Sequence, residues 1–297
     1  MEYRITLFTP TYNRAYILDR LYRSVQRQRF RDFEWLIIDD GSTDNTEELV
    51  RSWTAENNDF PIRYYKVPNG GKSRAINRAL DLAQGELFFT MDSDDYLTDD
   101  ALQKVDAWEK SLPKDGKFCG VAGNLGTSLC ETPNKPLPEP FVDADALQRY
   151  PQPGKALIDG ERAFVFYTAV HRQYPYPEFE GENFITEAVA WNRMAHDGYQ
   201  VRFFNDIIWV YAYQEDGLTR SGSSVFLKNP RGYGLWLREK ADYEHAGVLR
   251  YLQMYYTFIC DLFPLYSSRQ IADYIGAPHM LIAAIHTVRK LITLIRK

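Results

Sequence analysis

The sequence has few cysteines and no long uncharged apolar run, and each shortage excludes a class of protein. Its three cysteines, Cys119, Cys130 and Cys260, are scattered at spacings that fit neither a disulfide scaffold nor a zinc site. We expect all three to be reduced core residues. No uncharged apolar run reaches the roughly 18 residues that a membrane-spanning helix needs. Residues 1–14 lack the order of a signal peptide, so we expect a cytoplasmic protein.

An excess of positive charge is also missing, as are the usual glycine-rich phosphate motifs. The formal net charge of -5 gives no basic footprint for nucleic acid, so none is predicted as a partner. The GGKS stretch at 70–73 is not a P-loop, because the first glycine of that motif would fall on Lys66. The first predicted strand continues into TPTYNR without a glycine, which excludes a dinucleotide fingerprint.

What the sequence does contain is an alternation of strand and helix patterns over residues 1–123. Apolar, β-rich runs predict strands at 3–9, 33–39, 62–67, 86–91 and 118–123. Helical patterns lie between them at 16–29, 44–56, 72–84 and 99–110. This order predicts an α/β fold with a doubly wound, mainly parallel sheet.

The regular alternation stops at residue 124 and returns later in the chain. Six prolines between 133 and 153 exclude a long helix or a central strand there. Strand patterns reappear at 163–170, 201–205 and 207–213, with a helix at 184–197 between the first two. Beyond 222 the pattern is helical. We therefore predict one domain over 1–221, with halves 1–123 and 124–221, and a helical C-terminal region over 222–297.

Four of the predicted strands run into polar stretches at their carboxyl ends. These stretches are TPTYNR (9–14), DDGSTDNT (39–46), PNGGKSRAIN (68–77) and DSDD (92–95). Each alone is explained by a turn or a helix cap. Together they meet at one edge of a parallel sheet, where ligands bind in such folds.

The carboxylates of Asp92 and Asp94 are the strongest candidates for chemistry at this edge. Residues i and i+2 of a strand end face the same side, and two carboxylates held together favour a bound cation. An oxygen-only ligand set suits Mg²⁺ or Mn²⁺, which take further ligands from substrate phosphates. Lys72, at a predicted helix start, would add charge to such a phosphate. The alternative is that the acidic run caps the helix at 99–110, although Asp99 and Asp100 can fill that role.

Four motifs, in order, resemble those of a known family. TPTYNRAYIL, IIDDGSTDNT, GGKSRAINRAL and FFTMDSDD look like the nucleotide-sugar domain of a family 2 glycosyltransferase with the GT-A fold. The resemblance covers roughly residues 1–123 and returns at 182–194 and 209–219, where this chain has TE at 186–187 in place of the ED of many members. It implies that 1–123 binds the nucleotide sugar and that 124–221 binds the acceptor. Residues after 222 are not covered.

The resemblance also implies roles for individual residues. The nucleotide base would lie against Thr9, Thr11 and Tyr12, with Asp40 bonded to its edge. Asp92 would contact the ribose or the metal, and Asp94 would bind the metal that bridges the two phosphates. The general base would be Glu187, with Glu182 as a second candidate.

Two residues carry weaker predictions. Asp95 is a further acidic candidate, with a helix cap as its alternative. Tyr176, in the Pro-rich segment before Glu187, would either stack on the acceptor sugar or pack that segment against the fold.

The last predicted helix combines an apolar stripe with basic residues. The stripe is Leu281, Ile285, Val288, Ile292 and Ile295, and the basic residues are His286, Arg289, Lys290, Arg296 and Lys297. Such a helix packs on its own domain or forms a homodimer, or it lies on an anionic membrane surface through residues 278–297. Membrane contact would place the chain at the inner face of the cell membrane and would suit a lipid-linked acceptor.

The resemblance therefore implies a metal-dependent, inverting glycosyltransferase. It would move a sugar from a nucleotide diphosphate-sugar, in the first place a UDP-sugar, to a hydroxyl of a glycan or polyprenyl-linked acceptor, as in bacterial surface polysaccharide synthesis. One alternative is a sugar-phosphate nucleotidyltransferase, which would carry a glycine-rich, arginine-containing loop after the first strand. The other is a non-catalytic nucleotide-sugar-binding protein.

Overall fold

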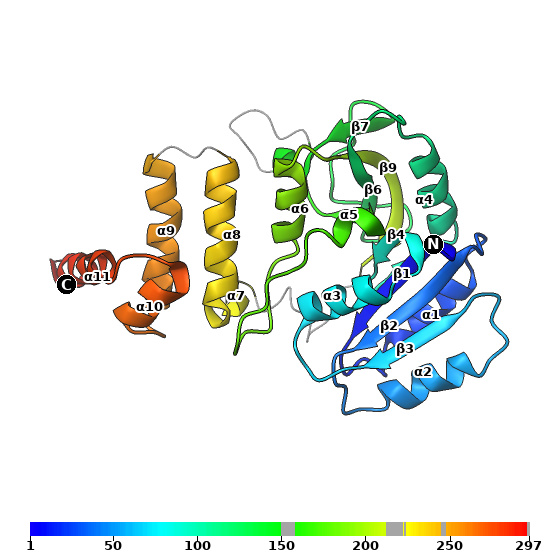
Figure 1. The fold of residues 1–297 in the computed structure, drawn as a ribbon, viewed down its shortest axis with the longest axis horizontal. Helices are drawn as coiled ribbons and strands as arrows, with labels where there is room; N and C mark the ends of the chain where they lie inside the picture. The colour runs from blue at the N-terminus through cyan, green and yellow to red at the C-terminus, as the bar shows by residue number, and fades with distance from the viewer. Residues whose placement is uncertain (150–157, 212–221, 223, 245–247, 296–297) are drawn as a thin grey trace. The chain divides into compact units, whose positions relative to one another are not determined.

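The computed structural model describes residues 1–149, 158–211, 222, 224–244 and 248–295, and the chain divides into two compact units (Figure 1). Unit 1 comprises Met1–Tyr176 and Arg193–Glu215, and unit 2 comprises Pro177–Asn192 and Asp216–Lys297. Residues 177–192 thus group with the C-terminal helices, which the sequence does not indicate. The predicted boundary at 221 lies outside the described residues and stays a prediction.

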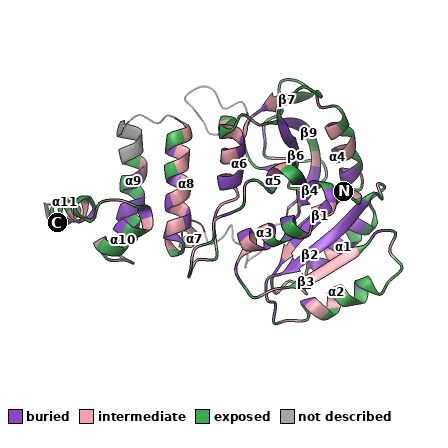
Figure 2. Cartoon of the chain, viewed as in Figure 1, coloured by how far each residue is buried: buried purple, intermediate pink, exposed green. Residues whose placement is uncertain are grey.

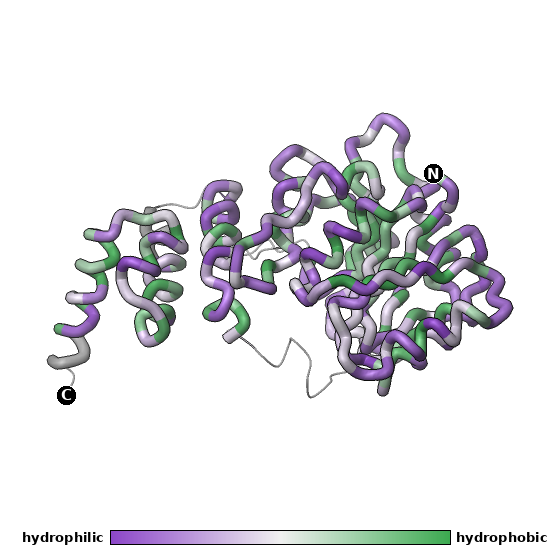
Figure 3. Tube along the Cα trace, turned by 60° about the horizontal axis from the view of Figure 1, so that its bottom comes forward, coloured by the Kyte–Doolittle hydropathy of each residue, from purple (hydrophilic) through white to green (hydrophobic). Residues whose placement is uncertain are grey.

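Within the described residues, unit 1 is built on a nine-stranded mixed sheet. The strands are β1 (Tyr3–Thr11), β2 (Phe33–Asp39), β3 (Ile62–Lys66), β4 (Gly85–Thr90), β5 (Tyr96–Leu97), β6 (Phe118–Gly126), β7 (Phe141–Ala144), β8 (Arg162–Tyr167) and β9 (Gln200–Val210). Their order is β3-β2-β1-β4-β8-β6-β9-β5, with β7 paired to β9. Figure 3 shows the central strands as a largely hydrophobic block.

The first half of the sheet is parallel throughout, and there β3, β2, β1 and β4 pair in the predicted way. In the second half, β6 and β9 also pair parallel. Strand β8 is antiparallel to both β4 and β6. A parallel return needs a covering crossover, usually an α-helix. In its described residues, the segment between β6 and β8 supplies β7 and the short 3-10 helix η1 (Ala146–Arg149) and no longer helix, and β8 pairs antiparallel. The prediction of a mainly parallel sheet is therefore correct for β1 to β4, whereas the second half of the sheet combines the parallel pair of β6 and β9 with antiparallel pairs.

Two predicted strand boundaries also differ from the structure. The run at 163–170 ends as a strand at Tyr167 and continues as the short helix α5 (Thr168–His171). The two strands predicted over 201–213 form one strand, β9, over the described part of that range. Its register against β6 shifts on either side of Asn124, so a bulge lies where the sequence pattern divides the two predicted strands.

Helices cover both faces of the parallel half. One hydrophobic cluster joins alternate strand residues such as Ile5, Leu7 and Trp35 to α1 (Leu18–Gln26), α2 (Thr46–Thr54) and α4 (Ala101–Lys110). The intervening strand residues point to the other face, where α3 (Lys72–Leu82) and α5 lie. Because both faces are covered, β1 and β2 are almost fully buried along their lengths (Figure 2). This burial fixes the strand ends that carry the candidate site.

Unit 2 contains the end of the chain. Its helices are α7 (Ser224–Lys228), α8 (Pro230–Tyr243), α9 (Val248–Leu262), α10 (Ser268–Ile275) and α11 (His279–Ile295), and α6 (Ala188–His196) begins in this unit and ends in unit 1. A separate core around Leu237, Phe258 and Ile271 holds them together. Within the described ranges, no helix is long and apolar enough to cross a bilayer.

The apolar stripe predicted for α11 is partly wrong. Ile282 is fully buried in the core of unit 2 and Ile285 packs against that core, whereas Leu281 and Val288 are exposed. The side chains of Ile292 and Ile295 lie outside the described part. The exposed side of α11 instead carries Leu281, Ala284, Val288 and Leu291, at 3-4-3 spacing.

The cysteines follow the sequence prediction at two of three positions. All three are free, and Cys119 and Cys260 are buried. Cys130 is exposed, because it lies in the irregular segment after β6 and outside the core. The prediction of a core role for Cys130 is therefore wrong.

Candidate active site

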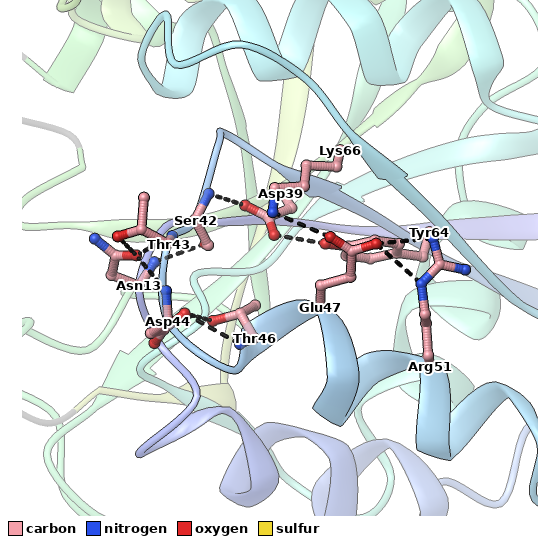
Figure 4. A network of polar contacts seen from close by, with 10 residues as sticks. All are labelled: Asn13, Asp39, Ser42, Thr43, Asp44, Thr46, Glu47, Arg51, Tyr64 and Lys66. Atoms are coloured by element: carbon pink, nitrogen blue, oxygen red, sulfur yellow. Dashed lines mark hydrogen bonds and ion pairs between the residues drawn. The ribbon is translucent and has the colours of Figure 1, made fainter.

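The loops after β1 and β2 are bonded to each other at the carboxyl edge of the sheet (Figure 4). Asn13 adopts a left-handed conformation with φ of 53°, which is uncommon outside glycine. Its side-chain oxygen accepts a hydrogen bond from the Thr43 backbone N–H at 2.8 Å. Its own N–H donates to the Ser42 hydroxyl at 2.8 Å, and the Ala15 N–H donates to the Asp44 carboxylate at 3.1 Å. These bonds fix the direction in which residues 13–15 leave the sheet.

The last residue of β2, Asp39, is an internal anchor for this edge. It is buried, and its carboxylate accepts from the Ser42 N–H at 2.7 Å and from the Tyr64 hydroxyl at 2.5 Å. Burial, together with the bond to Asp39, raises the pKa of Tyr64. Asp39 therefore joins β2 to β3 and to the following loop.

Asp40 holds the glycine loop that leads into α3. One carboxylate oxygen accepts from the Gly70 N–H at 2.7 Å, and the other accepts from the Gly71 N–H at 2.8 Å and from the Asn69 amide at 3.1 Å. Gly71 has φ of 91°, a conformation that favours glycine. Burial raises the pKa of Asp40, and the two backbone donors oppose that rise. The predicted bond from Asp40 to a base edge thus competes with bonds that the loop already makes.

The acidic turn after β4, residues 92–95, brings three predicted site residues together. Lys72 Nζ, in the first turn of α3, lies 2.6 Å from Asp92 Oδ1. Burial raises the pKa of Asp94, the negative charge of Asp92 raises it further, and Arg14 and Lys72 oppose the rise. Asp92 and Asp94 are therefore close enough to interact electrostatically, and their role as metal ligands stays a prediction.

Asp95 points elsewhere. It is 7% exposed, and its carboxylate accepts a hydrogen bond from the Trp209 indole N–H of β9 at 2.7 Å. The first turn of α4 receives no side-chain cap from Asp100 either. Asp95 is therefore a link between the acidic turn and the sheet, and its predicted alternative role as a helix cap stays a prediction.

The residues expected to border the base differ in accessibility. Thr9 is fully buried, and its hydroxyl accepts from the Trp35 indole N–H at 3.0 Å, so its side chain is part of the core. Thr11 is also buried, and its hydroxyl oxygen has no hydrogen-bond partner within the described part of the chain. Tyr12 is 47% exposed. Of the three side chains, Tyr12 is accessible to a base.

The two candidate bases lie in unit 2 and have different surroundings. The Glu182 carboxylate accepts from the backbone N–H groups of Arg231 at 2.8 Å and Gly232 at 2.9 Å, in the first turn of α8. Burial raises the pKa of Glu182, and these two donors oppose the rise. Glu187 directly precedes α6, is half-buried, and accepts from the Trp191 N–H through its carbonyl at 3.4 Å. The Glu182 carboxylate thus serves as a helix cap.

Tyr176 is 2% exposed, and its ring centroid lies 6.0 Å from that of His171. Its backbone N–H and carbonyl both bond to the Asn77 side chain of α3, at 2.9 and 2.8 Å. Tyr176 therefore takes the packing role that the sequence leaves open, and its side chain is closed to an acceptor sugar.

Sequence reasoning assigned no role to Arg14, which the structure places at the site. Arg14 Nη2 lies 3.8 Å from Asp94 Oδ2. The signal was present in the sequence, because Arg14 closes the TPTYNR motif at the carboxyl end of a strand.

Comparison with known proteins identifies the same part of the chain. Residues 6–126 match the family model described as Glycosyl transferase family 2. Over 108 residues the chain is 34% identical to the GalNAc(5)-diNAcBac-PP-undecaprenol beta-1,3-glucosyltransferase of Campylobacter jejuni. This alignment covers 34% of the chain and 33% of that relative, so the chain matches about a third of its length.

Solved structures extend the likeness to nearly the whole chain. Staphylococcus aureus TarS 1-349 in complex with UDP-GlcNAc is similar with a TM-score of 0.60 and 16% identity, over 97% of this chain and 87% of that one. A mannosyltransferase from Pyrobaculum calidifontis in complex with GDP-Man and Mn²⁺ is similar with a TM-score of 0.56 and 18% identity, over 98% of this chain and 81% of that one. At these identities the likeness concerns the fold. It confirms the predicted GT-A-like α/β fold with C-terminal helices.

The family match spans the ends of β1 to β4, where the four predicted motifs lie. The match and the geometry of those strand ends agree on the same residues. Over residues 6–126, the chain therefore matches glycosyl transferase family 2.

Proposed function

We propose that this chain is an inverting glycosyltransferase that moves a sugar from a nucleotide diphosphate-sugar to a hydroxyl acceptor. The observation that carries the proposal is the pair Asp92 and Asp94 after β4, with Lys72 against Asp92, inside the range that matches the family. TarS has been crystallised with UDP-GlcNAc and the archaeal mannosyltransferase with GDP-Man, so both neighbours hold nucleotide sugars. We favour a UDP-sugar as the donor.

The chain's own residues form the diphosphate side of the proposed site. Lys72 stands at the start of α3, where a side-chain cation and backbone N–H groups both favour phosphate oxygens. Asp40 holds this helix start in place through Gly70 and Gly71. Such a fixed arrangement stabilises charge that develops on a leaving diphosphate without reorganisation during the reaction.

The carboxylate oxygens of Asp92 and Asp94 fit a divalent cation as ligands. Asp92 and Asp94 offer only oxygen ligands, which suit Mg²⁺ or Mn²⁺, and burial together with the negative charge of Asp92 raises the pKa of Asp94. In the described part of the chain, no three His, Cys, Asp or Glu side chains gather at metal-binding spacing, so phosphate and water would complete the ligand set. A bound cation would offset the charge of the departing diphosphate. The neighbour with GDP-Man also holds Mn²⁺.

Glu187 is our candidate for the base that takes the proton of the acceptor hydroxyl. The resemblance in sequence implies that it aligns with the family's base, and the rival carboxylate of Glu182 is bonded to the first turn of α8. Direct attack of the hydroxyl on the sugar carbon, with no enzyme nucleophile, inverts that carbon.

We propose a lipid-linked glycan as the acceptor, with α11 on the membrane that carries it. The Campylobacter relative is named for an undecaprenol-linked substrate. Residues 274–297 contain four Lys or Arg residues and no Asp or Glu, in a chain of net charge -5. A second copy of α11 would bring the same positive charges against the exposed face at Leu281, Val288 and Leu291. An anionic lipid surface complements both the apolar face and the charge.

The membrane proposal is tested by sedimentation with vesicles. The chain should sediment with vesicles that contain phosphatidylglycerol, less with neutral vesicles, and less again after Val288→Glu and Leu291→Glu. Equal recovery with both vesicle types rejects the proposal. A concentration-dependent dimer that the same pair of substitutions dissolves would assign α11 to self-association.

The activity is tested by a thermal-shift screen of nucleotide sugars with Mn²⁺, followed by a transfer assay on polyprenyl-linked acceptors. A ligand that binds the native state raises the unfolding temperature. We expect a UDP-sugar to do so with Mn²⁺ and not after Asp94→Ala. Binding without any release of UDP would favour the non-catalytic alternative. Release of pyrophosphate from a sugar phosphate and a nucleoside triphosphate would favour the nucleotidyltransferase.

A further inference from the structure

Each carboxylate of the Asp92 and Asp94 pair faces a cation supplied by the chain itself. Lys72 lies at hydrogen-bond distance from Asp92, 2.6 Å, as an ion pair between α3 and the acidic turn. Arg14 faces Asp94 across 3.8 Å, which is an ion pair but longer than a hydrogen bond. Both side chains of the second pair are largely buried, at 14% and 22% exposure, so solvent screens their attraction only partly.

Arg14 is placed there by a backbone that the fold has fixed. The residue before it, Asn13, is held in its left-handed conformation by Ser42 and Thr43. The Arg14 N–H donates to the Thr46 hydroxyl at 3.2 Å, at the start of α2. The direction of the side chain is therefore built into the β1 and β2 loops.

The guanidinium of Arg14 also reaches a residue at the surface. Its Nη1 donates to the hydroxyl of Tyr16 at 2.9 Å, and Tyr16 is 62% exposed. Nη1 thus has a surface hydroxyl among its partners, and Nη2 faces a carboxylate beyond hydrogen-bond distance.

Arg20 acts on the same turn in a different way. Its guanidinium donates to the backbone carbonyl of Asp94 and lies over the ring of Tyr96, 5.1 Å from the centroid. Arg20 therefore holds the backbone of the turn, whereas Arg14 faces the carboxylate. This difference provides an internal comparison.

We infer that Arg14 is a built-in counter-ion that occupies the cation's place at Asp94 in the donor-free chain and pairs with the donor's diphosphate once a divalent cation binds. Two carboxylates side by side repel each other, and an arginine facing one of them relieves that repulsion. A divalent cation at Asp94 would repel the guanidinium. A diphosphate would attract it, because the planar fork of arginine pairs well with phosphate oxygens. The inference rests on the proposed function and adds to it a residue that links donor binding to cation binding.

The inference predicts effects of opposite sign on two equilibria. In Arg14→Met, Mn²⁺ alone should bind about threefold to tenfold more tightly, because its competitor is gone. UDP, added in the presence of Mn²⁺, should bind about tenfold to hundredfold more weakly, because a charged hydrogen bond to phosphate is lost. Calorimetry measures the second value, and the electron paramagnetic resonance signal of free Mn²⁺ measures the first. Arg14→Lys should restore most of the UDP affinity.

Two further variants separate this role from a structural one. Arg20→Met should weaken both Mn²⁺ and UDP, because it loosens the turn. Arg23→Met, on the exposed side of α1, should change neither. If Arg14→Met weakens both ligands as Arg20→Met does, Arg14 is structural and the inference is overturned. If it leaves both unchanged, the inference is also overturned. Failure of the wild-type chain to bind either ligand would instead reject the proposed function.

Discussion

The Glu182 carboxylate accepts a hydrogen bond from the backbone N–H of Gly232 at 2.9 Å, and its other oxygen accepts from the preceding N–H of α8. Both donors belong to the first turn of α8, where N–H groups have no partner within the helix. A sequence position that competes with Glu187 for a catalytic role is thus explained by helix capping. The two carboxylates should respond differently to the same substitution.

Glu182→Gln should lower stability and leave turnover nearly intact. The amide keeps one acceptor oxygen for two N–H groups and loses the charge that favours a helix N-terminus, a loss of about 1–2 kcal/mol. Thermal unfolding and the transfer rate measured well below the transition check this. Glu180→Gln, at an exposed position nearby, is the matched control and should change neither. A large loss of turnover in Glu182→Gln at unchanged stability would make Glu182 the base.

Glu187→Gln should have the reverse effect. Loss of a general base lowers turnover by about 10²–10⁴-fold, because the acceptor proton has no acceptor in the transition state. UDP affinity and the unfolding temperature should stay near the wild-type values, since the substitution preserves size. Full turnover in Glu187→Gln would contradict the assignment.

Asp40→Asn should loosen the loop that starts α3. The amide can accept at only one position, so one of the two glycine N–H groups is left buried and unpaired, at a cost of about 1–3 kcal/mol. Because Lys72 follows directly, UDP affinity should fall as well. Hydrogen exchange at Gly70 and Gly71 should accelerate in Asp40→Asn and not in Asp81→Asn, an exposed carboxylate on the same helix. Unchanged exchange at both glycines would show that the loop does not depend on Asp40.

The sequence predicted the parallel half of the sheet and the edge where its motifs meet, because strand and helix periodicity is a local property. It did not predict which polar residues face outward at that edge. Thr9 and Tyr12 lie three residues apart in one motif, yet one is fully buried under Trp35 and the other is exposed. Likewise, Asp94 and Asp95 are neighbours, and only a partner 114 residues away, Trp209, decides that Asp95 turns toward the sheet. Contacts between distant elements set these outcomes, and a local pattern does not contain them.

The buried histidine of α5 should make stability depend on pH. His171 is 2% exposed, and neither ring nitrogen has a hydrogen-bond partner within the described residues. The rings of Phe88, Phe166 and Tyr176 surround it at centroid distances of 5.7, 5.2 and 6.0 Å. Burial lowers the pKa of His171 from 6.5 to about 3. The folded chain therefore holds this imidazole neutral.

Between pH 6.5 and 3, the unfolded chain binds a proton at His171 that the folded chain does not. The contribution of neutral His171 to the free energy of unfolding is thus fully present above pH 6.5 and is lost as the pH falls toward 3. At about pH 5 the loss from this group should reach about 2 kcal/mol. His171→Phe should reduce the fall in the urea midpoint between pH 7 and pH 5, whatever its effect at pH 7. His196→Phe, at an exposed position, should leave the wild-type fall unchanged. The carboxylates of the protein titrate equally in all three chains. Parallel curves of urea midpoint against pH for wild type and His171→Phe would therefore mean that His171 is protonated in the folded state.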